Sequence, residues 1–260
     1  MSEASLQRLL GTHALITGAN RGIGAAIARA MSEAGADVTL LVRDAAAGEA
    51  MAATLSGRAH VVTASVTAEA AVQSAVRAAE ATFGPVHMAI NNAGAVESAR
   101  FLATDTAAWQ RLFEVNTLGA VHVTRAVLPS MLEARAGRVV MIASTAGLTG
   151  YPYVSAYVAA KHAVVGLVRA LAREVATSGV TVNAVCPGFT DTDLVAQSVA
   201  RIVHTTGRTP EQAAAALVQN NPQGRLVHPD EVADAVRWLC SRGASAITGQ
   251  AIAVAGGEVG

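Results

Sequence analysis

Residues 17–24 read TGANRGIG, and they join the apolar stretch HALIT at residues 13–17 to the alanine-rich stretch GIGAAIARAMSEAG at residues 22–35. The first stretch has the composition of a buried strand, and the second carries apolar residues at helical spacing. Glycine at such a junction permits a tight turn, a close approach of a phosphate group to the backbone, and close packing of helix on strand. The GxxxGxG spacing predicts a phosphate-binding loop, although three glycines could also form only a strand-to-helix turn.

Beyond this segment, short apolar stretches rich in β-branched residues alternate with helical segments. Together with HALIT they are DVTLLV, HVVTA, VHMAI, RVVMIA, VTVNAV and AIAVA. Strands separated by helices favour right-handed crossovers and a parallel sheet. We therefore predict an α/β protein whose residues 1–260 form a single domain, with a Rossmann-type, doubly wound, seven-stranded parallel sheet. Gly35 and Gly179, which end two helical segments, are expected to act as helix C-caps.

The alternation breaks between the sixth and seventh predicted strands, at about residues 190–228. Polar residues together with Gly207, Pro210 and Pro222 interrupt weak helical patterns there. An insertion of this length inside a compact domain is often functional. We expect a substrate lid in which EQAAAAL, at residues 211–217, forms a helix.

Composition limits the range of partners. Apolar residues make up 52% of the chain and aromatic residues 3%, so the core must consist of small aliphatic side chains. Nineteen Lys plus Arg balance nineteen Asp plus Glu, which argues against nucleic acid or an anionic membrane as a partner. No apolar stretch reaches membrane-span length, and the amino-terminal MSEASLQRLLG lacks the pattern of a secretory signal. A cytoplasmic protein with a small-molecule substrate is expected.

Cysteine and histidine give no metal-binding pattern. Cys186 and Cys240 are far apart and lack CxxC spacing, so buried free thiols are expected. His13, His60, His87 and His122 flank predicted strands or lie in predicted helices, without the spacing of a ligand set. No metal site is predicted.

Tyr157 and Lys161 form the candidate proton-transfer pair. Their spacing of four places both side chains on one face of a helix. A tyrosine pKa of about 10 is too high for proton exchange near neutrality, and a neighbouring ammonium favours the phenolate. Ser144 lies thirteen positions before Tyr157, just after the strand RVVMIA, and Asn116 lies in a helical stretch where a buried amide needs a partner. A Tyr and a Lys at this spacing are common in helices, so the pair carries weight only with these companions.

Three motifs in order along the chain resemble those of the short-chain dehydrogenase/reductase family: TGANRGIG, NNAG at residues 91–94, and YVAAK at residues 157–161. The resemblance implies an oxidoreductase that interconverts a carbonyl and a secondary alcohol with a nicotinamide dinucleotide. It implies that Tyr157 exchanges the proton, Ser144 orients and polarises the carbonyl, Lys161 lowers the pKa of the tyrosine and binds the nicotinamide ribose, and Asn116 holds a water of the proton relay.

The resemblance also implies the cofactor-binding residues. They are Gly18, Asn20, Arg21, Gly22, Ile23, Gly24, Arg43, Ser65, Val66, Asn92, Ala93, Gly94, Tyr157, Lys161, Pro187, Gly188, Thr190 and Thr192. Pro187 to Thr192 belong to a PGxxxT segment expected at the nicotinamide. Ser65 stands where many members of the family have aspartate, which departs from the family pattern.

The second predicted strand bears on the choice of dinucleotide. Val42 occupies the position where the family usually has the acid that binds the adenosine ribose. Arg43 follows it, and Arg43 with Arg21 could bind a 2′-phosphate. NADP(H) is therefore favoured over NAD(H). The alternative is that both arginines are solvated surface charges and that Asp44 reaches the ribose.

The region around YVAAK is similar to 3-oxoacyl thioester reductases and polyketide ketoreductases. We therefore expect an NADP(H)-dependent reductase of a 3-oxoacyl thioester, carried on CoA or a carrier protein. An NAD-dependent dehydrogenase of a cyclic or aliphatic secondary alcohol is the alternative, and a non-catalytic dinucleotide-sensing module is a remote one. The resemblance further implies a homotetramer joined partly through the helices that carry Asn116 and Tyr157.

Overall fold

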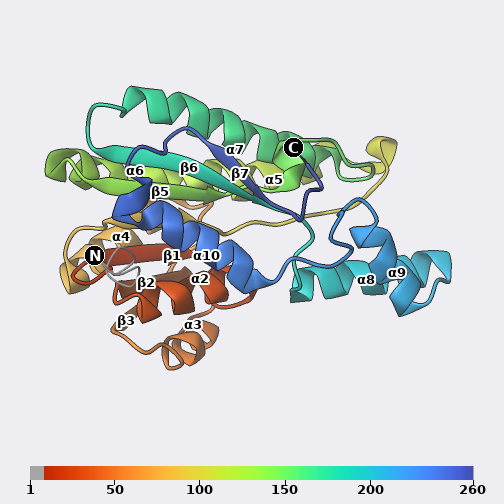
Figure 1. The fold of residues 1–260 in the computed structure, drawn as a ribbon, viewed down its shortest axis with the longest axis horizontal. Helices are drawn as coiled ribbons and strands as arrows, with labels where there is room; N and C mark the ends of the chain where they lie inside the picture. The colour runs from red at the N-terminus through yellow and green to blue at the C-terminus, as the bar shows by residue number, and fades with distance from the viewer. Residues whose placement is uncertain (1–8, 260) are drawn as a thin grey trace.

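The computed structural model describes residues 9–259, and its strands form one parallel sheet (Figure 1). The strands are β1 (His13–Thr17), β2 (Asp37–Val42), β3 (Ala59–Thr63), β4 (Met88–Asn91), β5 (Gly137–Ile142), β6 (Val180–Pro187) and β7 (Ala251–Val254). They pair in the order β3-β2-β1-β4-β5-β6-β7. The predicted seven-stranded, doubly wound Rossmann-type fold is confirmed. The prediction of no secretory signal rests partly on residues 1–8, which lie outside the described residues, as does Gly260.

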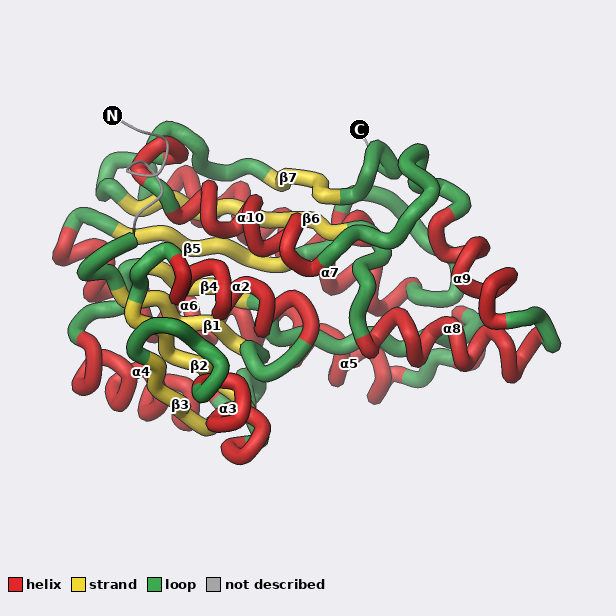
Figure 2. The backbone as a smooth tube through the Cα atoms, turned by 60° about the horizontal axis from the view of Figure 1, so that its bottom comes forward, coloured by secondary structure: helices red, strands yellow, loops and turns green. Residues whose placement is uncertain are grey.

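Helices cover both faces of the sheet. They are α2 (Gly22–Glu33), α3 (Ala45–Ala52), α4 (Glu69–Phe83), α5 (Thr106–Phe113), α6 (Gly119–Ala134), α7 (Ser155–Glu174), α8 (Asp193–Thr206), α9 (Pro210–Val218) and α10 (Pro229–Cys240). α2, α3 and α10 pack on one face, and α4, α6 and α7 on the other (Figures 1 and 2). Both cores consist of Ala, Val, Leu, Ile and Met with a buried cysteine in each, as the low aromatic content requires. Within residues 9–259, no helix has the length and apolar character needed to cross a membrane.

The sheet reverses its winding at β1. The chain passes from β1 through β2 to β3 at one edge, then returns to β4 on the other side of β1. In a doubly wound sheet the loops that follow such neighbouring strands diverge and leave a crevice, where ligands bind. The predicted glycine loop follows β1, and the NNAG motif is at the end of β4, so both lie at this crevice.

The β6–β7 insertion, residues 190–228, contains α8 and α9. These helices project from one end of the molecule, away from the sheet (Figures 1 and 2). α9 begins at Pro210 behind a capping box formed by Thr209 and Gln212, and it includes the predicted helix over residues 211–217. That the insertion covers a substrate stays a prediction.

One expected helix end was wrong. α7 ends at Glu174 with Val175 as its C-cap, four residues earlier than the predicted cap at Gly179. Gly179 instead has φ of 81° in the turn that enters β6, where a Cβ would lie 2.1 Å from the backbone oxygen of Arg135. The glycine is needed for this close approach. Gly35, with φ of 94°, follows the end of α2 as predicted.

Candidate active site

The loop between β1 and α2 depends on its glycines. Gly18 and Gly22 have φ of 64° and 52°, in the left-handed region that favours glycine. A Cβ on Gly24 would lie 2.3 Å from the backbone oxygen of Gly18 and 2.5 Å from Nδ2 of Asn92. α2 therefore packs against this loop at a distance that only glycine permits. Asn20 and Ile23, also predicted to bind the cofactor, lie in the same loop and first helical turn and are partly exposed.

The N-terminal end of α2 has no side-chain cap. Arg21 occupies the N-cap position in an extended conformation and makes no capping hydrogen bond. The first N–H groups of the helix therefore lack this partner, and the helix dipole adds partial positive charge there. Across the crevice, Cγ2 of Thr192 lies 3.3 Å from where a Cβ of Gly22 would be. The N-terminal end of α2 is therefore suited to an anion, and the segment after β6 lies against the loop that precedes it.

The NNAG motif ties β4 to β1. Oγ1 of Thr17 accepts hydrogen bonds from the N–H groups of Asn92 and Ala93, both at 2.9 Å. Nδ2 of Asn92 donates to the backbone oxygens of Thr17 and Gly18 at 2.9 and 3.2 Å. These bonds hold the glycine loop against the end of β4. Contact of this motif with a cofactor stays a prediction.

Asn116 lies in a π-helical segment, η2 (Glu114–Leu118), between α5 and α6. The sequence predicts only helix at this point, because a π-turn leaves no local pattern. Nδ2 of Asn116 donates to the backbone oxygens of Ala95 and Leu112 at 2.8 and 2.9 Å, and its Oδ1 accepts from the N–H of Ala95 at 3.2 Å. The side chain is buried, with the residue 3% exposed. The amide therefore fixes the loop after β4 to the helix.

Tyr157 and Lys161 lie one turn apart on α7. The Nζ atom of Lys161 is 5.7 Å from the centre of the Tyr157 ring and donates to the backbone oxygen of Ile142 at 2.8 Å. Ser144 lies two residues beyond the end of β5, where its hydroxyl accepts from the N–H of Ala146 at 3.1 Å and bonds the Tyr157 phenol. The end of β5 and α7 are thus joined through side chains.

Gly94 completes the grouping of the four predicted catalytic residues. A Cβ at Gly94 would lie 2.8 Å from Oδ1 of Asn116 and 3.6 Å from Nζ of Lys161. The absence of a side chain therefore brings the end of the NNAG motif against both residues. With Ser144 and Tyr157 in hydrogen-bond contact, the structure brings all four residues to the carboxyl ends of β4 and β5. Their roles in catalysis stay predictions.

Burial controls the charge of both groups on α7. It raises the pKa of Tyr157, while the hydrogen bond from Ser144 acts in the opposite direction. It also lowers the pKa of Lys161 to about 8. Near neutral pH the phenol thus keeps its proton and the lysine remains largely cationic. Lowering of the Tyr157 pKa by Lys161 stays a prediction for the enzyme with its cofactor.

The segment after β6 is preformed by its own hydrogen bonds. Pro187 ends β6, and the N–H of Gly188 donates to the backbone oxygen of Val254 at 3.1 Å. Oγ1 of Thr190, a residue only 4% exposed, donates to the oxygen of Gly188 at 3.0 Å. Oγ1 of Thr192 donates to the oxygen of Thr190 at 3.2 Å. Both threonine hydroxyls therefore shape the segment in this structure, and their contacts with a cofactor stay predictions.

The end of β2 is followed by a basic residue, Arg43, rather than by an acid, and Arg21 lies in the loop after β1. Val42 is buried, whereas Arg43 and Arg21 are exposed. Asp44 caps α3, since its carboxylate accepts from the N–H of Ala47 at 3.1 Å. The alternative role of Asp44 at a ribose competes with this cap.

Ser65 and Val66 lie after β3. Oγ of Ser65 is 2.8 Å from Oγ1 of Thr67, and the backbone oxygen of Val66 is 2.9 Å from Nδ1 of His122. Ser65 thus takes part in a local hydroxyl contact rather than in the strand pairing. Whether this pair contacts adenine is untested.

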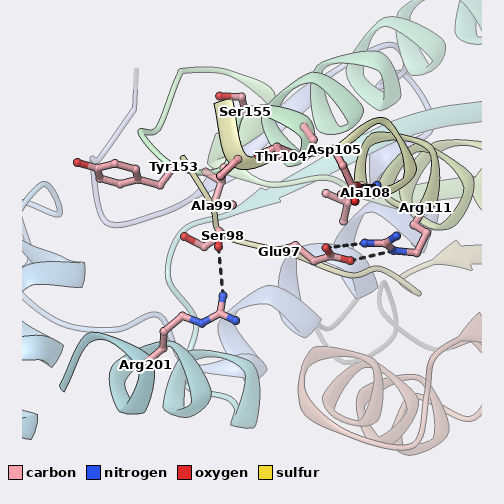
Figure 3. A pocket seen from close by; sticks show the side chains of 14 residues that line it. Glu97, Ser98, Ala99, Thr104, Asp105, Ala108, Arg111, Tyr153, Ser155 and Arg201 are labelled. Carbon is pink, nitrogen blue, oxygen red and sulfur yellow. Dashed lines mark hydrogen bonds and ion pairs between the residues drawn. The ribbon is translucent and has the colours of Figure 1, made fainter. Parts of the chain in front are cut away.

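A cavity of about 350 Å³ lies beside the N-terminal end of α7. Its walls come from the loop after β4, from α5, from residues 153–156 and from Arg201 of α8. Nη1 of Arg201 reaches across to the backbone oxygen of Ser98 at 3.3 Å, and Arg111 pairs with Glu97 at 3.0 Å (Figure 3). The β6–β7 insertion therefore contacts the loop that leads from the NNAG motif. No sequence signal predicted this cavity.

Sequence reasoning also missed three residues beside Ser144. Tyr151 contacts both Thr145, at 2.8 Å between hydroxyl oxygens, and Glu258, at 2.7 Å from its Oε1. Glu258 follows two glycines near the carboxyl end of the chain, and this pair is the one local signal of a special turn. Nothing in the sequence indicates which residue the turn contacts.

Cys186 and Cys240 are both buried and free, as the sequence predicts. Across residues 9–259, no group of three or more His, Cys, Asp and Glu side chains is placed to hold a metal ion.

Comparison with known proteins places these features in context. The family model described as short chain dehydrogenase matches residues 12–202. The chain is 36% identical over 247 residues to the 3-oxoacyl-(acyl-carrier-protein) reductase FabG of Haemophilus influenzae, covering 95% of this chain and 98% of that protein. It is 40% identical over 232 residues to a Xanthobacter autotrophicus protein named inactive 2-(S)-hydroxypropyl-CoM dehydrogenase 2, covering 89% and 98%. The crystal structure of levodione reductase matches with a TM-score of 0.91 at 30% identity, covering 96% and 98%.

Proposed function

This chain belongs to the short-chain dehydrogenase/reductase family, enzymes that act on CH–OH and C=O groups, and we propose that it is an NADP(H)-dependent reductase of 3-oxoacyl thioesters. The observation that carries the proposal is the convergence of Asn116, Ser144, Tyr157 and Lys161 beside the glycine loop, at the carboxyl ends of the strands. Ligands of doubly wound sheets bind at this edge.

The residues of the crevice fit a nicotinamide dinucleotide. The left-handed Gly22, the tight packing at Gly24 and the uncapped end of α2 suit a pyrophosphate, because they expose backbone N–H groups without side chains in the way. The nicotinamide, when bound, supplies the hydride chemistry. The chain's own residues supply orientation and the proton.

Tyr157 is the proposed proton donor. Burial raises its pKa, so the phenol carries a proton at neutral pH, and in the reducing direction Tyr157 donates this proton to the carbonyl oxygen. The neighbouring ammonium of Lys161 favours the phenolate and so opposes the effect of burial on this pKa. Ser144 polarises and orients that oxygen through its hydroxyl. The ammonium of Lys161 stabilises the phenolate that remains, and Asn116 supports a water that returns the proton. In the oxidising direction the same phenolate acts as the base.

Preference for NADP(H) is supported by charge at the end of β2. Arg43 follows β2 and is exposed, and Arg21, in the loop after β1, is exposed as well. Val42 offers no acid, and Asp44 is engaged as the cap of α3. A 2′-phosphate is bound well by guanidinium groups through charge-assisted hydrogen bonds. An acid in the place of Val42 would instead repel the phosphate.

The thioester substrate is supported by the likeness to FabG and by the cavity beside α7, which we assign to the part of the substrate away from the reacting carbonyl. We also propose that the chain forms one catalytic domain in which residues 190–228 act as a lid. The alternative, a dehydrogenase of a secondary alcohol, draws support from the relative named for hydroxypropyl-CoM. That relative's name also includes the word inactive, so a non-catalytic, dinucleotide-binding function is retained as a third alternative.

A homotetramer is proposed for the assembly. Phe101 and Leu102, in η1 (Phe101–Ala103), are 65% and 97% exposed and lie in the chain just before α5. Exposed large apolar side chains of this kind are common where copies of a chain associate. Sedimentation analysis tests this directly, and a monomer at micromolar concentration would refute it.

Steady-state kinetics with acetoacetyl-CoA and a ketone panel, each with NADPH and NADH, test the function. We expect turnover of acetoacetyl-CoA with NADPH. Strict use of NADH without thioester turnover would favour the alcohol dehydrogenase. Tyr157→Phe should abolish turnover and retain NADPH binding, and wild-type activity in that variant would refute the assigned role.

A further inference from the structure

Glu258 lies against the loop that carries Ser144. Its Oε1 is 2.7 Å from the phenol oxygen of Tyr151, which is in turn 2.8 Å from Oγ1 of Thr145. Thr145 directly follows Ser144 and is only 3% exposed. A continuous hydrogen-bonded path therefore runs from a carboxylate near the carboxyl end of the chain to the residue next to Ser144.

The carboxylate fixes the direction of this path. Glu258, when ionised, can only accept, so the phenol of Tyr151 must donate its single proton to Glu258. The hydroxyl of Thr145 must then donate to the phenol oxygen. Each of the three side chains is left with one orientation, and hydrogen bonds to an ionised group are the strong ones.

The backbone before Glu258 is shaped to deliver this carboxylate. Gly256 and Gly257 have φ of 61° and 92°, in the region that side chains disfavour. A Cβ on Gly256 would lie 2.2 Å from Oδ1 of Asn221, and one on Gly188 would lie 2.8 Å from Oε2 of Glu258. The turn thus fits only without side chains, and the second carboxylate oxygen lies against the segment after β6.

Tyr151 acts as a fixed strut between these groups. Burial raises its pKa to about 12, and the carboxylate of Glu258 adds to this effect while the hydrogen bond with Thr145 opposes it. The phenol therefore stays protonated and does not compete with Tyr157 as a base. Its ring packs edge-on against Phe189, with 6.2 Å between ring centres.

We propose that Glu258 is a positioning residue, which holds Ser144 in place through Tyr151 and Thr145 and so sets where the substrate carbonyl is polarised. The inference rests on the proposed function, because Ser144 contacts a carbonyl only in that reaction. Removing the strut leaves the fold and the cofactor loop intact but loosens Ser144.

The test compares Glu258→Ala, Glu258→Gln, Tyr151→Phe and the double variant Glu258→Ala/Tyr151→Phe. Glu174→Ala, on the exposed end of α7, is the matched control. For each we measure kcat and KM with acetoacetyl-CoA and NADPH, or with whichever ketone of the panel the wild type reduces. NADPH affinity by fluorescence titration, the Tm, and amide hydrogen exchange of residues 144–151 complete the set.

We expect kcat to fall about 10- to 100-fold in Glu258→Ala and Tyr151→Phe, the loss that follows a small misplacement of a reacting group. NADPH affinity should stay within about twofold of the wild type, as in the control. The double variant should be no worse than Tyr151→Phe, because both changes break one path. Glu258→Gln should recover most of the rate, since its amide oxygen can still accept the phenol proton.

Hydrogen exchange should accelerate in residues 144–151 in Glu258→Ala and Tyr151→Phe and not in the control, whether or not a substrate has been found. Wild-type kcat and exchange in both Glu258→Ala and Tyr151→Phe would overturn the inference, as would additive losses in the double variant. Failure of the proposed function would give a different result from failure of this inference. It would appear as wild-type turnover in Tyr157→Phe or as absence of turnover in the wild type. If Glu258→Ala does not fold, the test compares Tyr151→Phe, which should lose rate, with Glu258→Gln, which should keep most of it.

Discussion

The Nζ atom of Lys161 lies 5.7 Å from the centre of the Tyr157 ring, while its own hydrogen bond goes to the backbone oxygen of Ile142. Burial shifts the pKa values of the two groups in opposite directions. It disfavours the charged form of each, which is the deprotonated phenolate for the tyrosine and the protonated ammonium for the lysine. The pKa of the lysine falls to about 8 and that of the tyrosine rises. Of this pair, the lysine therefore titrates nearer to neutral pH.

The rate of carbonyl reduction should decline as pH rises through about 8. Above that pKa Lys161 loses its charge, and the phenolate formed at Tyr157 is no longer stabilised. The measurement is kcat/KM from about pH 6 to about pH 10. Lys161→Met should lower kcat about 100-fold or more and remove this decline. A wild-type profile that is flat through pH 8 would contradict the assignment.

Gly24→Ala should weaken NADPH binding at least tenfold. Its Cβ would lie 2.3 Å from the backbone oxygen of Gly18, so α2 must move away from the loop, and overpacking of this kind costs about 1–3 kcal/mol. Gly166→Ala on α7 is the control, since nothing lies within 4 Å of its Cβ position. The control should gain about 0.5–1 kcal/mol of stability by helix propensity. Titration of NADPH and thermal unfolding measure the two effects, and equal affinities would rule out the steric argument.

Arg43→Ala should lower NADPH affinity and leave NADH affinity unchanged. A lost hydrogen bond to a charged phosphate is worth about 1.5–3 kcal/mol, or about 10- to 100-fold in the dissociation constant. Arg173→Ala, also exposed but at the far end of α7, serves as control. If both cofactors weaken equally in Arg43→Ala, the arginine does not recognise the 2′-phosphate.

Stability should fall as pH drops below about 6.5, partly through His13. The ring is buried between Oγ1 of Thr39, at 2.8 Å, and the backbone oxygen of Gly84, at 2.9 Å. Burial lowers its pKa below the ordinary value of 6.5, so the unfolded chain takes up a proton at a pH where the folded protein does not. This contribution is complete above pH 6.5 and is lost as pH falls through the folded pKa.

Urea unfolding of the wild type and of His13→Gln at about pH 7.5 and about pH 5.5 measures this effect. The variant should lose less stability between the two pH values than the wild type does. His162→Gln, on the exposed side of α7, is the control and should follow the wild type. Identical pH dependence in wild type and His13→Gln would show that another group is responsible.

The fold and the grouping of Asn116, Ser144, Tyr157 and Lys161 could be predicted because their signals are local. Each strand is an apolar stretch between helical patterns, and the predicted stretches differ from the observed strands by one or two residues at some ends. In a parallel sheet, every residue that follows a strand lies at the same edge. Sequence order alone therefore brought Ser144 and the NNAG motif together.

The features that escaped prediction depend on contacts between distant segments. Glu258 and Tyr151 are 107 positions apart, and no periodicity links them. The π-helical turn at Asn116 conforms to the helical pattern around it, and the glycine at 179 serves a close contact with Arg135 rather than a helix end. These features depend on the packing of segments that are distant in the chain, and a single sequence does not reveal which segments pack together.

Because the strands are parallel, the carboxyl ends of all of them lie at one edge of the sheet and their amino ends at the opposite edge. The predicted site residues near a strand lie at or beyond its carboxyl end, whereas His13, His87 and the turn at Gly84 lie where β1 and β4 begin. Tethers to a solid support, fused tags or thermostabilising changes placed at the starting ends of the strands should leave turnover unaffected. An immobilised form of this enzyme should therefore be attached through residues at the amino ends of the strands.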